Sequence, residues 1–123
     1  MTNLSRRRVL IVDDVEDTVT SFAFLLSEMG HLVEYTTHPE AALVLARRFA
    51  PELAFLDIGM PRIDGWQLGA LIKSEPALKA IRLVALTGYG APEHRQRSMS
   101  LGFEAHLLKP VEIRSVERVL LAA

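Results

Sequence analysis

The sequence predicts one α/β domain built on a doubly wound parallel β-sheet, with helices on both faces of the sheet. Short apolar runs rich in β-branched residues alternate along the chain with longer stretches whose apolar residues have helical spacing. The short runs are apolar at nearly every position, which is typical of strands covered on both faces and joined by right-handed crossovers. The 123 residues match one ordinary domain, so we expect a single domain over 1–123 with a core at about 7–121.

Five segments carry the strand pattern. Helical spacing lies between and after them, as at Phe22, Leu25, Leu26 and Met29, and again at Ile113, Val116 and Leu120. The predicted strands are Val9–Val12, Leu32–Tyr35, Leu53–Leu56, Leu83–Leu86 and Ala105–Leu108.

Residues that start or stop helices flank the predicted helical stretches. Pro39 and Pro92 suit first helical positions, Gly30 and Gly102 suit helix ends, and Asp64 can cap a helix that begins at Gly65. The stretch after Pro92 is the most polar of the helical segments. We therefore expect the helix in this stretch to be the least firmly packed.

Composition excludes several classes of function. The 14 Lys and Arg residues balance 15 Asp and Glu residues to a net charge of −1, which predicts neither a nucleic-acid partner nor a membrane partner. The sequence has no cysteine, so it offers no disulfides, thiolate metal sites or cysteine catalysis. The basic N-terminal residues precede an apolar run too short for a signal peptide, and no apolar run reaches membrane-spanning length. We expect a cytoplasmic protein.

Polar residues stand where four of the predicted strands end. In an open parallel sheet, ligands bind outside the carboxyl ends of the strands, where the strand order reverses. The first strand ends in two adjacent carboxylates. The third strand ends in a carboxylate, the fourth in a hydroxyl and the fifth in an ammonium group. These residues are Asp13, Asp14, Asp57, Thr87 and Lys109.

Three clustered carboxylates call for a hard cation, and Mg²⁺ is held by carboxylates, carbonyl oxygens and waters. A carboxylate can also act as a nucleophile that forms an aspartyl-phosphate. A cation, a lysine and a hydroxyl would then neutralise the oxygens of the transferred phosphoryl group. Asp57 is the best-placed nucleophile because it stands alone between the acidic pair and the Thr87 and Lys109 positions.

Four motifs make the chain resemble the receiver (response regulator) domain of two-component signal transduction systems, including the chemotaxis regulators. The motifs are "VDD" at 12–14, "LDIGMPRIDG" at 56–65, "ALTGYG" at 85–90 and "LLKP" at 107–110. They occur in order and at family-like spacing over nearly the whole chain. The resemblance implies a flavodoxin-like fold with strand order 2-1-3-4-5.

The resemblance also implies roles for the strand-end residues. Asp57 would accept a phosphoryl group from a phosphohistidine on a histidine kinase or a histidine phosphotransfer domain. Asp14, Asp57 and the backbone carbonyl of Gly59 would bind Mg²⁺, with Asp13 acting through a water or as a further ligand. Thr87 would hydrogen-bond the phosphoryl group and Lys109 would pair with it. The family further implies a cis peptide bond between Lys109 and Pro110.

Two features depart from the common family pattern. The family usually has Tyr or Phe three residues before the lysine, where this chain has His106. His106 is either an altered switch that works with Thr87 or a half-exposed strand residue without a role. Neither Gly59 nor Tyr89 offers an acid or amide to orient a hydrolytic water, so we expect slow self-dephosphorylation, with Tyr89 shielding the site.

Other residues have alternative interpretations. Arg6, Arg7 and Arg8 are expected to form a solvated arm that enters the first strand, rather than a docking site. Phe24, with Val15 and Val19, forms either an apolar patch for a partner's helix or simple edge packing. The remaining histidines lack ligand spacing and are expected at the surface: His31, His38 and His94.

The leading interpretation is a signalling switch in a phosphorelay, whose phosphorylation changes the face formed by the fourth helix, fifth strand and fifth helix for a downstream protein partner. It would not be an enzyme beyond its own phosphoryl transfer and hydrolysis. One alternative is a non-phosphorylated protein–protein adaptor; another is an aspartyl-phosphate hydrolase, which usually has a second acid where Gly59 stands. The chain is expected to be either a single-domain regulator or a receiver domain cut from a longer protein. That longer protein would be a longer regulator or a hybrid histidine kinase, and residues 83–110 resemble the receivers of hybrid kinases.

Overall fold

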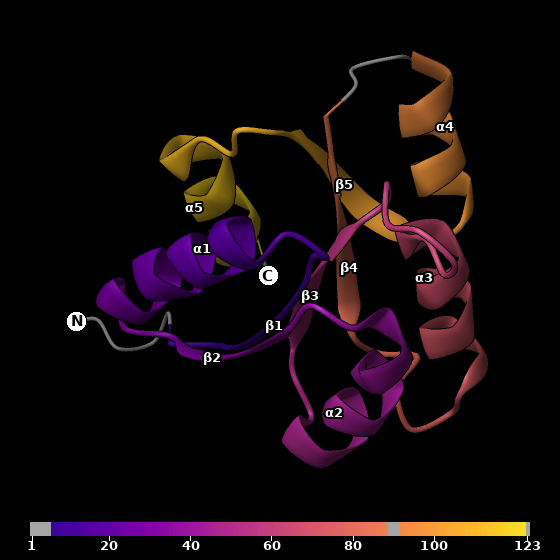
Figure 1. Cartoon of the computed structure of the whole chain (residues 1–123), viewed down its shortest axis with the longest axis horizontal. Helices are drawn as coiled ribbons and strands as arrows, with labels where there is room; N and C mark the ends of the chain where they lie inside the picture. The colour runs from indigo at the N-terminus through magenta and orange to yellow at the C-terminus, as the bar shows by residue number, and fades with distance from the viewer. Residues whose placement is uncertain (1–5, 89–91, 123) are drawn as a thin grey trace.

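A computed structural model describes residues 6–88 and 92–122 of the chain. Strands and helices alternate from one end to the other (Figure 1). The strands are β1 (Arg8–Val12), β2 (Leu32–Thr36), β3 (Leu53–Asp57), β4 (Arg82–Thr87) and β5 (Phe103–Leu108). The helices are α1 (Glu16–Glu28), η2 (Pro39–Ala41), α2 (Ala42–Phe49), α3 (Gly65–Ser74), α4 (Pro92–Ser100) and α5 (Ile113–Leu121).

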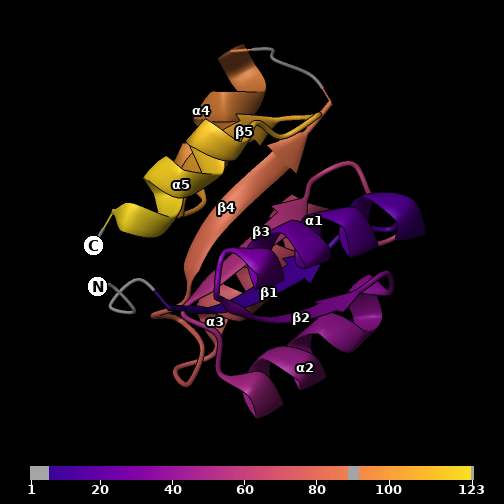
Figure 2. The ribbon, with the colours of Figure 1, turned by 90° about the vertical axis from the view of Figure 1, so that its left-hand side faces the viewer.

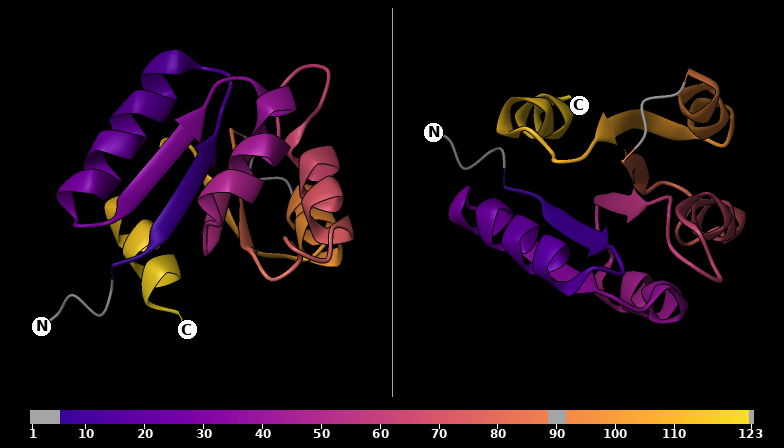
Figure 3. Two further views of the ribbon diagram at one scale, coloured as in Figure 1. Left: turned by 90° about the horizontal axis from the view of Figure 1, so that it is seen from below. Right: turned by 45° about the horizontal axis from the view of Figure 1, so that its top comes forward.

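The five strands form one parallel sheet in the order β2-β1-β3-β4-β5 (Figure 2). The predicted fold class and strand order are therefore confirmed. Helices α1 and α5 cover one face of the sheet, and α2, α3 and α4 lie on the other (Figures 1 and 3). Strand β1 pairs with β2 on one side and with β3 on the other. The sheet therefore grows in one direction from β1 to β2 and in the opposite direction from β3 onward, so the strand order reverses between β1 and β3.

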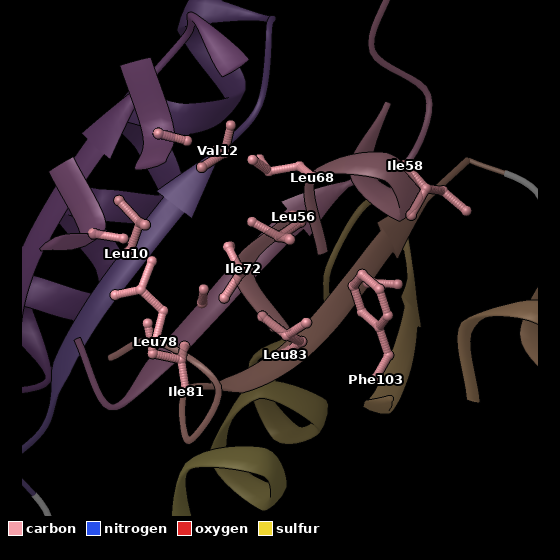
Figure 4. Close-up of a cluster of buried hydrophobic side chains, with 14 of the residues drawn as sticks. Leu10, Val12, Leu56, Ile58, Leu68, Ile72, Leu78, Ile81, Leu83 and Phe103 are labelled. Atoms are coloured by element: carbon pink, nitrogen blue, oxygen red, sulfur yellow. The ribbon is translucent and has the colours of Figure 1, made fainter. Parts of the chain in front are cut away.

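Two buried apolar clusters flank the sheet. The cluster beneath α2 and α3 packs inward-facing side chains of β1, β3 and β4 against residues such as Leu68 and Ile72 (Figure 4). The opposite cluster lies beneath α1 and α5, where Phe22 meets Phe55 edge to face with ring centroids 4.9 Å apart. All five residues of β3 are buried. Strand β3 thus forms a rigid central support for the residues at its carboxyl end.

The predicted elements agree closely with the structure. The fifth strand begins at Phe103, two residues before its predicted start. Its register with β4 shifts, because Leu83 pairs with Phe103 whereas the next residue, Val84, pairs with Ala105. Pro39 starts a 3₁₀ turn that leads into α2. Gly30 and Gly102 follow α1 and α4 with φ of 98° and 95°, which favours glycine.

Asp64 caps α3 as predicted. The Asp64 carboxylate accepts a hydrogen bond of 2.8 Å from the Gln67 N–H. In return the Gln67 side chain accepts one of 3.0 Å from the Asp64 N–H. This reciprocal arrangement is a capping box, which fixes where α3 begins.

Two surface interpretations are wrong. His31 is buried, and its Nδ1 accepts a hydrogen bond of 3.0 Å from the Arg7 N–H. Val19 is fully buried and cannot join an apolar patch with the exposed Phe24. The arginines agree with the expected solvated arm that enters the first strand. Arg6 and Arg8 are exposed, Arg7 is half-buried, and Arg8 is the first residue of β1, where its Nε donates to the Ala50 carbonyl.

His38 is exposed, as expected, whereas His94 is half-buried. No helix in the described part of the chain is long and apolar enough to cross a membrane.

Candidate functional site

The predicted site residues meet at the carboxyl edge of the sheet. Backbone hydrogen bonds continue past the strand ends and hold each residue in register. The Asp13 N–H donates to the Thr36 carbonyl at 3.3 Å, and the Lys109 N–H donates to the Thr87 carbonyl at 2.7 Å. Ile58, directly after Asp57, donates to the Leu86 carbonyl at 3.0 Å. The site is therefore built on the ordered ends of the strands.

Lys109 links the two buried carboxylates. Its Nζ lies 2.9 Å from Asp13 Oδ2 and 3.1 Å from Asp57 Oδ2. Asp13 is fully buried and Asp57 nearly so. The second oxygen of each carboxylate accepts a backbone hydrogen bond, Asp13 from the Val15 N–H at 3.0 Å and Asp57 from the Gly59 N–H at 2.9 Å. Both side chains are thus held in one orientation.

Burial and nearby charges shift the pKa values of Asp13 and Lys109. Burial, together with the nearby negative charge of Asp57, raises the pKa of Asp13 even though Lys109 and the Val15 N–H act to lower it. Burial alone would lower the pKa of Lys109, but its bonds to Asp13 and Asp57 raise it overall. Lys109 therefore carries its positive charge beside the two carboxylates.

Asp14 completes a cluster of three carboxylates. One oxygen each from Asp13, Asp14 and Asp57 lies within 4.8 Å of the others, and Asp14 is exposed. When ionised, the three acids carry three negative charges against the single charge of Lys109. An all-oxygen donor set with excess negative charge fits a small divalent cation such as Mg²⁺. Gly59, whose carbonyl was predicted as a further ligand, is exposed beside Asp57.

Close backbone packing holds the loop after Asp57 in place. A Cβ atom on Gly65 would lie 2.6 Å from the Asp57 carbonyl oxygen, so only glycine lets α3 begin so near the strand. A Cβ on Gly59 would meet only Asp57 Oδ1, at 3.5 Å. The space beside the Asp57 carboxylate is therefore open at Gly59.

The other predicted residues lie around the same edge. Thr87 is buried at the end of β4, and the Lys109–Pro110 peptide bond is cis, as the family resemblance implied. Tyr89, predicted to shield the site, lies outside the described residues. A groove of about 560 Å³ adjoins Lys109 between α1 and the segment after β5, and Phe22, Leu25 and Leu86 contribute apolar lining.

His106 has partners that the sequence did not reveal. It is half-buried, and its Nδ1 lies 3.0 Å from the hydroxyl oxygen of Ser98, which in turn accepts a hydrogen bond of 2.9 Å from the Trp66 indole N–H. Sequence reasoning missed Trp66 and Ser98. The available signal was the tryptophan itself, because a packed indole N–H needs an acceptor.

Comparisons with known proteins show what the chain is similar to. The profile of the response regulator receiver domain matches residues 9–120. An uncharacterized 14.6 kDa protein of Leptolyngbya boryana is 34% identical over 126 residues, covering 99% of this chain and 96% of that protein. The polar-differentiation response regulator DivK of Brucella anthropi is 29% identical, covering 92% of this chain and 93% of DivK. A gliding motility regulatory protein of Myxococcus xanthus is 34% identical over 85% of this chain, which spans only 13% of that longer protein.

Solved structures have the same fold. The signal receiver domain of a DNA-binding response regulator from Colwellia psychrerythraea superposes with a TM-score of 0.86 at 25% identity, covering 92% of this chain and 94% of that one. A response regulator from Chloroflexus aurantiacus gives a TM-score of 0.87 at 27% identity, covering 96% and 99%. The chemotaxis protein CheY4 of Vibrio cholerae gives 0.87 at 23% identity, covering 94% and 96%, and supports the fold alone.

Proposed function

Because the chain belongs to the response regulator receiver domain family, we propose that it is a phospho-accepting switch of a two-component phosphorelay, with Asp57 as the acceptor. Receiver domains are generally signalling switches rather than enzymes. The proposed chemistry is therefore limited to phosphoryl transfer onto the chain itself and its later hydrolysis.

The observation that carries the proposal is the position of Asp57 between an ammonium group and two further carboxylates. Lys109 Nζ lies 3.1 Å from Asp57 Oδ2. Asp13 and Asp14 each have a carboxylate oxygen within 4.8 Å of an oxygen of Asp57. The cationic side chain can pair with a phosphoryl group, and the two acids can hold the metal that the reaction needs. This set favours phosphoryl transfer over a site made only of structural ion pairs.

In the proposed step, a carboxylate oxygen of Asp57 attacks the phosphorus of a phosphohistidine. A P–O bond to Asp57 forms as the P–N bond breaks, and the imidazole leaves with the electron pair of that bond. Lys109 then pairs with a phosphoryl oxygen in place of the Asp57 carboxylate. Thr87 donates a hydrogen bond to a second phosphoryl oxygen. The Gly59 N–H, which holds Asp57 Oδ1 at 2.9 Å, keeps the carboxylate aimed during the transfer.

Asp13, Asp14, Asp57 and the Gly59 carbonyl would hold Mg²⁺. When bound, this ion would neutralise negative charge on the transferring phosphoryl group. Asp13 stays fixed by Val15 and Lys109, so the cluster is assembled before a cation arrives.

The proposed partners follow from the same chemistry. A histidine kinase or histidine phosphotransfer domain would supply the phosphoryl group, and a downstream protein would recognise the face of α4, β5 and α5. A groove of about 760 Å³ lies on this face, lined by residues that include His106, Leu108, Arg118 and Val119. The cytoplasmic location, the single-domain organisation and an origin in a hybrid histidine kinase stay predictions.

Intact mass tests the proposal directly. The chain is incubated with Mg²⁺ and acetyl phosphate, a small phosphodonor, beside Asp57→Asn as the matched control. We expect the mass of one phosphoryl group to appear on the wild type and not on the variant. Phosphorylation of both chains would contradict Asp57 as the acceptor. No gain, with Mg²⁺ binding intact, would favour the adaptor interpretation, whereas continuous release of phosphate at enzyme-like rates would favour the hydrolase.

The decay of the phosphorylated chain tests the predicted slow self-dephosphorylation. Gly59 offers no acid or amide to orient a water, and the space beside Asp57 is open at that position. We expect Gly59→Asn to shorten the phosphoryl lifetime, because its amide can hold a water near phosphorus, whereas Gly59→Ala should not. A wild-type half-life of seconds would contradict the prediction.

A further inference from the structure

Helix α4 has little apolar surface of its own with which to pack. Among the described residues of α4, Ser98 is the one that is buried. Met99, its large apolar residue, is 47% exposed. In most helices, burial of an apolar face supplies the stability, so α4 depends on other contacts to hold its position.

Those contacts centre on the Ser98 hydroxyl. The Trp66 indole N–H on α3 donates to Ser98 Oγ at 2.9 Å, and His106 Nδ1 on β5 lies 3.0 Å from the same oxygen. The indole N–H can only donate, so Ser98 Oγ accepts from Trp66 and still has a lone pair and a proton with which to pair with His106 Nδ1. One buried hydroxyl therefore connects three elements of the fold.

The same face of α4 also covers the Trp66 ring. The Arg97 guanidinium carbon lies 4.2 Å from the ring centroid, and the His94 ring meets it nearly edge-on at 5.4 Å. Positions 94, 97 and 98 follow helical spacing, so they lie on one side of α4. Figure 1 shows α4 beside α3.

We infer that Ser98 is a positioning residue that latches α4 to α3 and β5, and that this latch opens when Asp57 is phosphorylated. The opening step rests on the proposed function. Lys109, which pairs with Asp57, directly follows β5, and His106 lies three residues earlier. A phosphoryl group adds negative charge and bulk at Asp57, so Lys109 must move and displaces the end of β5. A hydrogen bond of 3.0 Å tolerates little stretching before it is lost.

The latch is tested first without any phosphodonor. Hydrogen exchange of the α4 amides and fluorescence emission are measured on the wild type and on Ser98→Ala. Trp66 is the single tryptophan of the sequence, so the tryptophan emission reports on the surroundings of this one residue. We expect exchange in α4 to rise about threefold or more in Ser98→Ala, because a buried hydrogen-bond partner is lost. The Trp66 emission should shift in the same variant.

Control variants separate the latch from general damage. Ser100→Ala removes an exposed hydroxyl of the same helix that bonds only locally, to the Arg97 carbonyl at 2.9 Å. We expect Ser100→Ala to match the wild type and Ser98→Thr, which keeps the hydroxyl, to restore the emission. His106→Leu removes the ring nitrogen on β5 that pairs with Ser98 and should also speed hydrogen exchange in α4. The latch is overturned if Ser98→Ala and His106→Leu both match the wild type.

Phosphorylation then tests the opening step. Intact mass confirms that the wild type carries the phosphoryl group before exchange and emission are measured. We expect the hydrogen exchange of α4 and the Trp66 emission of the phosphorylated wild type to move toward the values of unphosphorylated Ser98→Ala. A phosphorylated wild type that keeps its resting values overturns the opening step. No mass gain would instead contradict the proposed function, and the variants measured without phosphodonor would still decide whether the latch exists.

Discussion

Gly65 controls how closely helix α3 approaches the strand that carries Asp57. Its missing Cβ would lie 2.6 Å from the Asp57 carbonyl oxygen and 2.8 Å from the Ile58 Cα, and both are backbone atoms that cannot turn aside. We expect Gly65→Ala to lower the free energy of unfolding by about 1–3 kcal/mol and to slow phosphorylation of Asp57. Urea unfolding measures the first effect and intact mass the second.

Gly59→Ala is the matched control for Gly65→Ala. Its Cβ would make one ordinary contact of 3.5 Å with Asp57 Oδ1, so its stability should stay within about 0.5 kcal/mol of the wild type. Equal stability of the two alanine variants would mean that α3 can move away from β3 at no penalty.

His31 makes stability depend on pH. Burial and the nearby Arg7 lower the pKa of His31, and its Nδ1 must be unprotonated to accept the Arg7 N–H. Glu52 opposes the shift but does not cancel it. Below about pH 6.5 the unfolded chain therefore binds a proton that the folded chain does not, so this contribution to stability is lost as pH falls. Above that pH it is fully present.

Urea unfolding at pH 7.5 and pH 5.5 tests this linkage. We expect the wild type to lose more stability between the two values than His31→Gln, which cannot titrate. His38→Gln, at an exposed position, should behave as the wild type does. The assignment fails if His31→Gln keeps the full pH dependence.

At the scale of elements, a lysine side chain fixes the connection between α3 and β4. Lys73 Nζ donates to the Lys79 carbonyl at 2.9 Å and to the Ile81 carbonyl at 2.8 Å. Both carbonyls lie in the connection that leads into β4. We expect Lys73→Met to lower the free energy of unfolding by about 1–3 kcal/mol, because two carbonyls lose a charged donor. Urea unfolding, with the exposed Lys79→Met as control, measures the loss; equal stability of the two variants would contradict this role.

Elements also differ in how they are held. Strand β3 is buried along its whole length, whereas α4 depends on Ser98, Trp66 and His106. The acceptor Asp57 thus stands on the rigid part of the fold, and the segment proposed to respond stands on a part that a few hydrogen bonds control. This division suits a switch, because the site keeps its geometry while a weakly held helix changes.

At the scale of the whole molecule, the carboxylate cluster should couple cation binding to stability. A cation that binds the folded chain alone raises the free energy of unfolding by about 1.4 kcal/mol at ten times its dissociation constant. We expect Mg²⁺ to stabilise the wild type in urea unfolding and EDTA to reverse the effect. Asp14→Asn should show a smaller gain, because exposed Asp14 belongs to the carboxylate cluster. An equal gain in the variant would remove Asp14 from the proposed ligands.

The sequence determined the fold class, the strand positions to within two residues, and which polar residues gather at the sheet edge. It did so because parallel strands all present their carboxyl ends at one edge, so the residue after each apolar run is placed by topology alone. The predicted cap at Asp64 depended on local chemistry and was confirmed for the same reason.

Only the tertiary structure decided which side chains meet across distant elements. The burial of His31, the exclusion of Val19 from the surface and the Trp66–Ser98–His106 contacts depend on how helices turn and pack against the sheet. A single polar residue in a helix carries no signal of its partner 8 or 32 positions away. Local pattern therefore fixes the elements and the edge at which they end, whereas packing decides the contacts that couple one element to another.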